Sequence, residues 1–132
     1  MDTEQDMAQI EAAALALPWA TRKELADRLM RSLAEERDED NYRFLERGAD
    51  IIRDTFGRDI RQRSRERDLV DLRTVYCYRM RQEGIYLRVI GAYLNLDHST
   101  VQFHVTKMND AFKYPKAFPG LVKKYNTFNQ AI

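Results

Sequence analysis

Four consecutive polar residues in the C-terminal half have side chains that could make specific hydrogen bonds with a ligand. Asp97, His98, Ser99 and Thr100 follow a short turn signal and open an apolar helical pattern. In a helix-turn-helix, residues at this place lie closest to the base edges of the DNA major groove. A carboxylate can accept from a cytosine amino group, hydroxyls can bond bases or phosphates, and the methyl of Thr100 can touch a thymine methyl. Alternatively, Asp97 or Ser99 only caps the helix, because Ser99 with Gln102 fits a capping box.

The sequence gives little indication of catalysis, a metal or a nucleotide cofactor. His98 and His104 are six residues apart, about 240° around a helix, so they cannot ligate one metal ion from one helix face. Cys77 falls on an apolar face with nothing to place it near His98, which argues against a nucleophilic pair. Neither G-x-x-x-x-G-K-[ST] nor G-x-G-x-x-G occurs, so a phosphate-cradling loop is not expected. We expect no enzymatic activity, no cofactor and no metal site.

The helices that must position the polar residues can be predicted from apolar spacing and from Gly and Pro. With 5 Gly, 3 Pro and no alternating apolar run, the sequence is typical of an all-α protein. A helix is expected over residues 68–83, ending at Gly84, with Cys77 packed on its apolar face. That face comprises Leu69, Leu72, Val75, Tyr76 and Met80.

Two further helices around a tight turn make a helix-turn-helix candidate. The apolar periodicity predicts a short helix over residues 87–94, a turn at 95–97 and a helix over 98–112. A loop with two prolines follows at residues 113–120, and residues 121–131 could form a closing helix. The inner face of the helix over 98–112 comprises Val101, Val105 and Met108.

The N-terminal part is expected to contain three helices. One covers residues 4–17 and stops before Pro18, because the residue ahead of a proline is pushed out of the α region. A second over residues 21–36 opens with a capping-box pattern, a polar break follows at 37–41, and a third helix ends near Gly57. These helices predict an acidic bundle or hairpin. The apolar residues from Leu17 to Leu33 would form its core or a dimerisation surface, and we favour the core.

Charge divides the chain into two parts although the net charge is only +1. Residues 1–60 carry 9 Lys and Arg against 15 Asp and Glu, and residues 61–132 carry 13 against 6. The first part is therefore −6 and the second +7. We expect an acidic helical region over residues 1–60, for a homodimer contact or a protein partner, and a basic domain over 61–132 that meets a polyanion. The junction reads as a basic linker because four arginines alternate there: Arg61, Arg63, Arg65 and Arg67.

Five short motifs occur in a fixed order between residues 63 and 112. They are Ser64-Arg65-Glu66-Arg67, Leu72-Arg73-Thr74, Leu87-Arg88-Val89-Ile90-Gly91, Asp97-His98-Ser99-Thr100-Val101 and Lys107-Met108. Together they resemble the C-terminal DNA-binding domain of the bacterial replication initiator DnaA. The resemblance implies an all-helical domain with a Trp-repressor-like helix-turn-helix that recognises short duplex boxes. The nucleotide-hydrolysing motor domain of that family has no counterpart in this sequence.

The resemblance also implies roles for individual residues and a double-stranded DNA partner. The major groove would be read by Asp97, His98, Ser99 and Thr100. Arg65, with Arg63 or Arg67, would enter the neighbouring minor groove. Arg73 and Lys107 would hold phosphates, in keeping with the rule that phosphate contacts position a protein and base contacts specify its site. The expected function is sequence-specific regulation of transcription or replication initiation, without ATPase activity.

Two other functions stay open. The acidic N-terminal helices could make this a protein-interaction module, with the helix-turn-helix kept only as a fold. RNA or single-stranded nucleic acid could stack on the tail aromatics, although these side chains could equally anchor the last helix: Tyr114, Phe118, Tyr125 and Phe128. The single cysteine, the acidic N-terminus and the lack of a long apolar run predict a cytoplasmic, non-membrane protein. By resemblance it would be nucleoid-associated in a bacterium.

Overall fold

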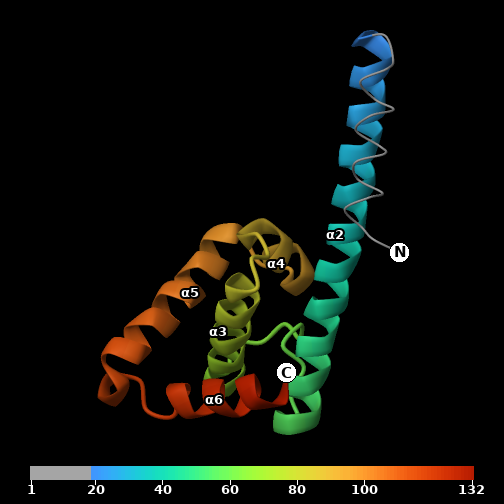
Figure 1. Cartoon of the computed structure of the whole chain (residues 1–132). Helices are drawn as coiled ribbons and strands as arrows, with labels where there is room; N and C mark the ends of the chain where they lie inside the picture. Colours follow the sequence, from blue (N-terminus) through green and yellow to red (C-terminus); the bar gives the residue numbers. More distant parts are fainter. Residues whose placement is uncertain (1–18) are drawn as a thin grey trace. The chain divides into compact units, whose positions relative to one another are not determined.

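All regular structure in the described part of the chain is helical. The computed structural model describes residues 19–132, and the helix expected over residues 4–17 lies outside them. The elements are α2 (Trp19–Phe56), α3 (Arg67–Gln82), α4 (Leu87–Leu94), α5 (His98–Lys113), a short 3-10 helix (Pro115–Ala117) and α6 (Leu121–Ala131) (Figure 1). The predicted all-α class is confirmed for this part, and the helices after residue 66 begin and end within a residue of their predicted bounds. None of them is both long and apolar enough to cross a membrane.

The prediction of a break in the helix at residues 37–41 is wrong. Helix α2 continues through it for 38 residues without interruption, so the segments on either side cannot fold back on each other as a hairpin. The break contains no Gly or Pro, and its Asp and Asn residues each cost a helix well under 1 kcal/mol. The interpretation of the preceding apolar residues as a bundle core is also wrong, because Leu29, Met30 and Leu33 are exposed.

A compact unit comprises Asn41–Ile132, whereas the described residues 19–40 belong to a separate unit. The unit thus takes in residues 41–60, which the sequence analysis grouped with the acidic region. Leu45, Ala49 and Ile52 are buried in its core. Residues 41–60 carry four basic and four acidic side chains. The charge contrast therefore follows the compact units as well: the compact unit keeps the surplus of basic residues, and residues 1–40 keep the surplus of acidic ones.

Helix α3 is the centre of the compact unit, with α4, α5 and α6 packed against it (Figure 1). Its predicted apolar face is buried, and Cys77 is buried with it. Cys77 is a core residue, and its burial raises the pKa of its thiol. The helix ends before Gly84, whose φ of 87° is a conformation that glycine adopts without strain. The side chains that α5 and α6 bury in the same core include Val101, Val105, Met108, Leu121 and Phe128.

The aromatic residues near the C-terminus mainly pack the fold. Phe128 is fully buried, and the ring of Tyr125 stands edge-on to those of Tyr78 and Phe112, with centroids 5.4 Å and 5.1 Å away. Only Tyr114 is largely exposed. The arrangement favours the packing interpretation of this cluster over a surface for stacking bases.

Candidate nucleic-acid interface

The turn between α4 and α5 is tight and depends on two residues. Asn95 adopts a left-handed conformation (φ 57°, ψ 45°), which Asn tolerates better than most residues. The amide of Leu96 then donates a hydrogen bond of 2.7 Å to the carbonyl oxygen of Gly91. A Cβ atom on Gly91 would lie 2.5 Å from the Leu96 carbonyl oxygen, so only glycine permits this close approach. The turn places residues 97–100 at the beginning of α5.

All four predicted base-reading residues are exposed there, and three of them form one hydrogen-bonded group. The Ser99 hydroxyl donates to Asp97 Oδ2 over 2.9 Å, and His98 Nδ1 lies 3.0 Å from Asp97 Oδ1. The Ser99 hydrogen bond, together with His98, holds the pKa of the Asp97 carboxyl below its usual value. The capping alternative is not realised, because no side-chain cap closes the start of α5. His98 and Ser99 are thus held against the Asp97 carboxylate, and Nε2 of His98 takes no part in this contact.

The loop between α2 and α3 is shaped by Arg73, which was expected to hold a phosphate. Its guanidinium is buried and donates to three carbonyl oxygens of the loop: Ile60 at 2.9 Å, Ser64 at 2.6 Å, and Gln62. Desolvation lowers the pKa of Arg73, although nearby Cys77 and Asp59 offset part of that effect. In this structure Arg73 is therefore a structural residue, since three of its five N–H donors hold the loop backbone.

Three other predicted arginines point into solvent. Arg63, Arg65 and Arg67 are exposed, and none of them takes part in the ion pairs found among residues 19–132. Their neighbour Arg61 is fixed instead: its Nε donates to the Tyr93 carbonyl over 2.9 Å, and its guanidinium lies 4.5 Å from the centroid of the Tyr93 ring. The loop and the first residue of α3 thus carry three unpaired positive charges, and hydrogen bonds from Arg61 and Arg73 hold the loop backbone.

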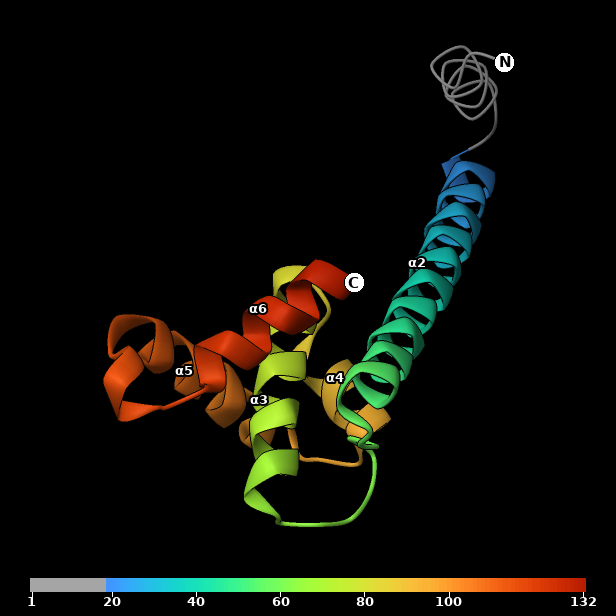
Figure 2. The same ribbon diagram turned by 90° about the horizontal axis from the view of Figure 1, so that it is seen from below.

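A hollow of about 590 Å³ brings this arginine loop next to the turn before α5. The loop contributes residues 61–65, and the end of α4 and the turn contribute residues 94–96; Arg73 completes the lining. None of these residues is acidic. Figure 2 shows the loop from α2 to α3 passing close to the connection between α4 and α5. Two segments about 30 residues apart in sequence therefore line one hollow, and its positive charge comes from the loop and Arg73.

Lys107, the last predicted phosphate contact, takes part in an ion-pair network. Its amine lies 3.7 Å from Asp71, which also pairs with Lys124 at 3.4 Å. Lys124 lies 2.9 Å from Asp68, and Arg58 extends the network to the same carboxylate. Lys107 therefore faces α3 and is not an unpaired cation in this structure.

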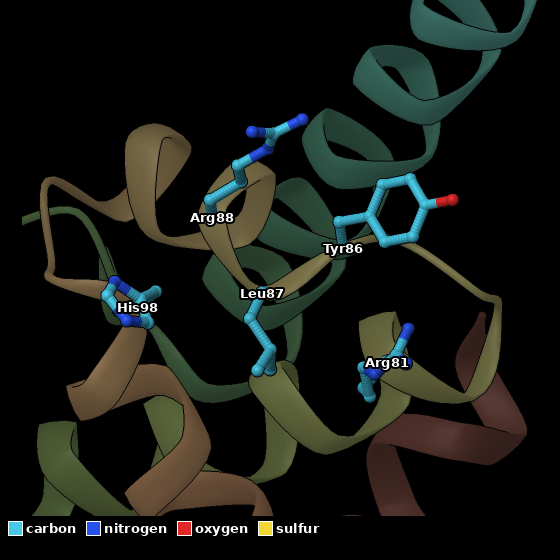
Figure 3. A pocket seen from close by; sticks show the side chains of 5 residues that line it. All are labelled: Arg81, Tyr86, Leu87, Arg88 and His98. Atoms are coloured by element: carbon cyan, nitrogen blue, oxygen red, sulfur yellow. The ribbon is translucent and has the colours of Figure 1, made fainter.

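A second pocket of about 430 Å³ lies at the start of α4 and is lined by two arginines to which the sequence analysis gave no role (Figure 3). It is lined by Arg81, Tyr86, Leu87, Arg88 and His98. Figure 3 shows Leu87 between His98 and Arg81, while Arg88 projects away from them on the outside of α4. Among the described residues, no hydrogen bond or ion pair engages the exposed Arg88 guanidinium. His98 thus lines a pocket with Arg81 and also contacts Asp97.

The sequence analysis also missed three exposed side chains on the outer face of α5: Gln102, Phe103 and Thr106. The signal was present, because they lie three, four and seven residues after Ser99 and so share its helix face. By contrast, His104 points inward. Its Nδ1 lies 2.8 Å from the Thr74 hydroxyl, and desolvation lowers its pKa to about 4.

Comparison with known proteins adds no relative: no protein-family model, curated protein or solved structure matches the chain. Within residues 19–132, no three His, Cys, Asp or Glu side chains gather closely enough to hold a metal ion. A functional assignment therefore depends on the geometry of the basic surface and the exposed face of α5.

Proposed function

We propose that the compact unit Asn41–Ile132 binds duplex DNA sequence-specifically. In this proposal α4, the turn and α5 act as a helix-turn-helix, with α5 in the major groove in the manner of the DnaA DNA-binding domain. Asp97, His98, Ser99 and Thr100 contact base edges. The protein would regulate transcription or replication initiation, without ATPase activity.

The observation that carries the proposal is the hollow that joins the arginine loop to the turn. Major-groove and minor-groove contacts need a helix N-terminus and a basic segment at adjacent places on one surface. Here the unpaired Arg63 and Arg65 lie on the loop that borders the turn leading into α5. Arg73 supports this arrangement indirectly, because its hydrogen bonds hold the loop that carries them.

The second flank supports the same mode of binding. DNA backbones run along both sides of a major groove, so a helix placed in it needs cations on both sides. Arg81, at the end of α3, lines one pocket with His98, and Arg88 projects outward from the start of α4. We therefore add Arg88 and Arg81 to the proposed phosphate contacts, in place of Arg73 and Lys107.

The proposal can be tested by selecting sites from a random duplex-DNA library with the purified protein at near-physiological salt. The wild-type chain should enrich a motif, and a His98→Ala, Thr100→Ala variant should fail to enrich it. Both residues are exposed, so the variant should keep its fold, which its helical circular-dichroism spectrum and thermal unfolding would check. No enrichment by the wild-type chain would contradict the proposal.

A second candidate function belongs to α2. Met30 and Leu33 lie on the acidic part of this helix and expose 69% and 61% of their surfaces. They are three residues apart and so share a helix face, and neighbouring exposed apolar side chains mark interaction sites. A homodimer contact or a protein partner would bury them. Light scattering over a range of concentrations would detect self-association, with the double variant Met30→Glu, Leu33→Glu as the comparison. A wild-type chain that stays monomeric would exclude the homodimer contact and leave a different protein as the partner.

A further inference from the structure

The outer face of α5 continues beyond the residues proposed to read bases. Successive residues of a helix are about 100° apart, so Ser99, Gln102, Phe103 and Thr106 fall within an arc of about 100°. All four are exposed. The buried side of α5, from Val101 to Ala111, lies opposite. A duplex that meets Ser99 in its major groove would also meet the next two turns of this face.

Phe103 is the unusual member of this face. Its side chain is 62% exposed, although the core has aromatic positions that bury their rings completely. Its ring stands edge-on to the neighbouring His104 ring, with the two centroids 5.9 Å apart. Within the major groove, the apolar group available to such a ring is the C5-methyl group of thymine.

Gln102 is held in a geometry suited to a purine. Its side-chain amide donates to the Thr106 hydroxyl over 3.2 Å. A primary amide has a second N–H and a carbonyl oxygen, so this bond orients the group without exhausting it. The free N–H and carbonyl match adenine, which presents an N7 acceptor and an N6 donor at the edge of the groove.

We infer that α5 selects neighbouring A·T pairs, with Phe103 against a thymine methyl and Gln102 on an adenine. This inference rests on the proposed function and deepens it, since it names the bases that the middle of α5 prefers. Thr106 is a positioning residue, because it acts only through the Gln102 amide. The same surface would otherwise be a protein-docking patch, which would show no dependence on base chemistry.

The test changes single atoms of the DNA. In the site selected by the wild-type chain, each thymine is replaced in turn by uracil, which lacks only the C5-methyl group. Each adenine is likewise replaced by 7-deazaadenine, which lacks only the N7 acceptor. Affinities of the full chain are then compared with those of Phe103→Ala and Gln102→Ala. Tyr114→Ala is the matched control, because this aromatic is equally exposed but lies after the end of α5.

We expect one uracil substitution to weaken wild-type binding about fourfold, the factor for losing one buried methyl group. That penalty should disappear in Phe103→Ala and persist in Tyr114→Ala. One 7-deazaadenine substitution should weaken wild-type binding about tenfold and have no effect on Gln102→Ala. A selected site that tolerates every substitution, or penalties that persist in both variants, would overturn this inference while leaving the proposed function intact. Failure to select any site would overturn both.

Discussion

Arg73 shows how a residue's role depends on what surrounds its charge. Its guanidinium is buried and spends three of its five N–H donors on carbonyl oxygens of the loop, so it holds the backbone first. Its burial could not be foreseen from the sequence, because it requires the loop before α3 to fold over it. Arg63 and Arg65 have the opposite environment: both are exposed, so their predicted contact with DNA stays a prediction that their surroundings allow.

Replacing Arg73 by alanine should lower the free energy of unfolding by about 3 kcal/mol, because it leaves three carbonyl oxygens in or near the core without their donors. Arg67→Ala, at an exposed position nearby, should change it by no more than about 0.5 kcal/mol. Urea denaturation of the two variants would measure the difference. A stable Arg73→Ala variant that had lost only DNA affinity would restore the phosphate role.

His104 makes the stability of the compact unit depend on pH. Its folded-state pKa, about 4, lies below the usual value of 6.5, so the unfolded chain binds the proton more tightly. The stabilisation is fully present above pH 6.5 and is lost as the pH falls from there toward 4. Between pH 7 and pH 5 the loss should be about 2 kcal/mol.

Denaturation curves at the two pH values would test this. The loss attributed to His104 should be absent from His104→Gln and present in His98→Ala, in which the exposed histidine is removed instead. An equal loss in wild type and His104→Gln would assign the pH dependence to other groups.

At the scale of the element, α3 to α6 were predictable and the continuity of α2 was not. Apolar spacing with Gly84, Pro115 and Pro119 defined α3 to α6, because each of these helices buries one face, while Gly84 and Pro115 follow the ends of α3 and α5. The charged residues at 37–41 looked like a break, yet none of them stops a helix. The exposed face in the middle of α5 could have been predicted from the start of the helix, because Gln102, Phe103 and Thr106 follow Ser99 at helical spacing.

The connection between α4 and α5 should be sensitive to one methyl group. Gly91→Ala would place a Cβ atom 2.5 Å from the Leu96 carbonyl oxygen, and because that atom belongs to the backbone, the turn must shift. We expect a loss of about 2 kcal/mol in the free energy of unfolding and weaker binding to the selected site. Ala92→Ser, at the next and exposed position of α4, should change neither by much. If Gly91→Ala kept the stability and affinity of the wild type, the turn would accommodate the added methyl group and this prediction would be wrong.

At the scale of the whole molecule, charge is segregated between the part of the chain before residue 41 and the compact unit. A basic unit that contacts about five phosphates should lose DNA affinity steeply with salt, with a slope near −4.5 in a plot of the logarithm of the binding constant against that of salt concentration. Arg63→Ala, Arg65→Ala should make this slope shallower by about two. Titrations between 50 and 200 mM salt would measure both slopes. An affinity that does not change with salt would rule out phosphate contacts as a major part of binding.

The central claim is that α5 reads bases while the arginine loop holds the backbone, and one comparison tests it most directly. The affinities of three proteins are measured for the selected duplex and for a scrambled duplex of equal length. They are the wild type, the double variant His98→Ala, Thr100→Ala and the double variant Arg63→Ala, Arg65→Ala. The first double variant should lose its preference for the selected site and keep its affinity for the scrambled one. The second should weaken on both duplexes by the same factor. If both double variants weakened equally on the two duplexes, the assignment of base reading to the start of α5 would be wrong.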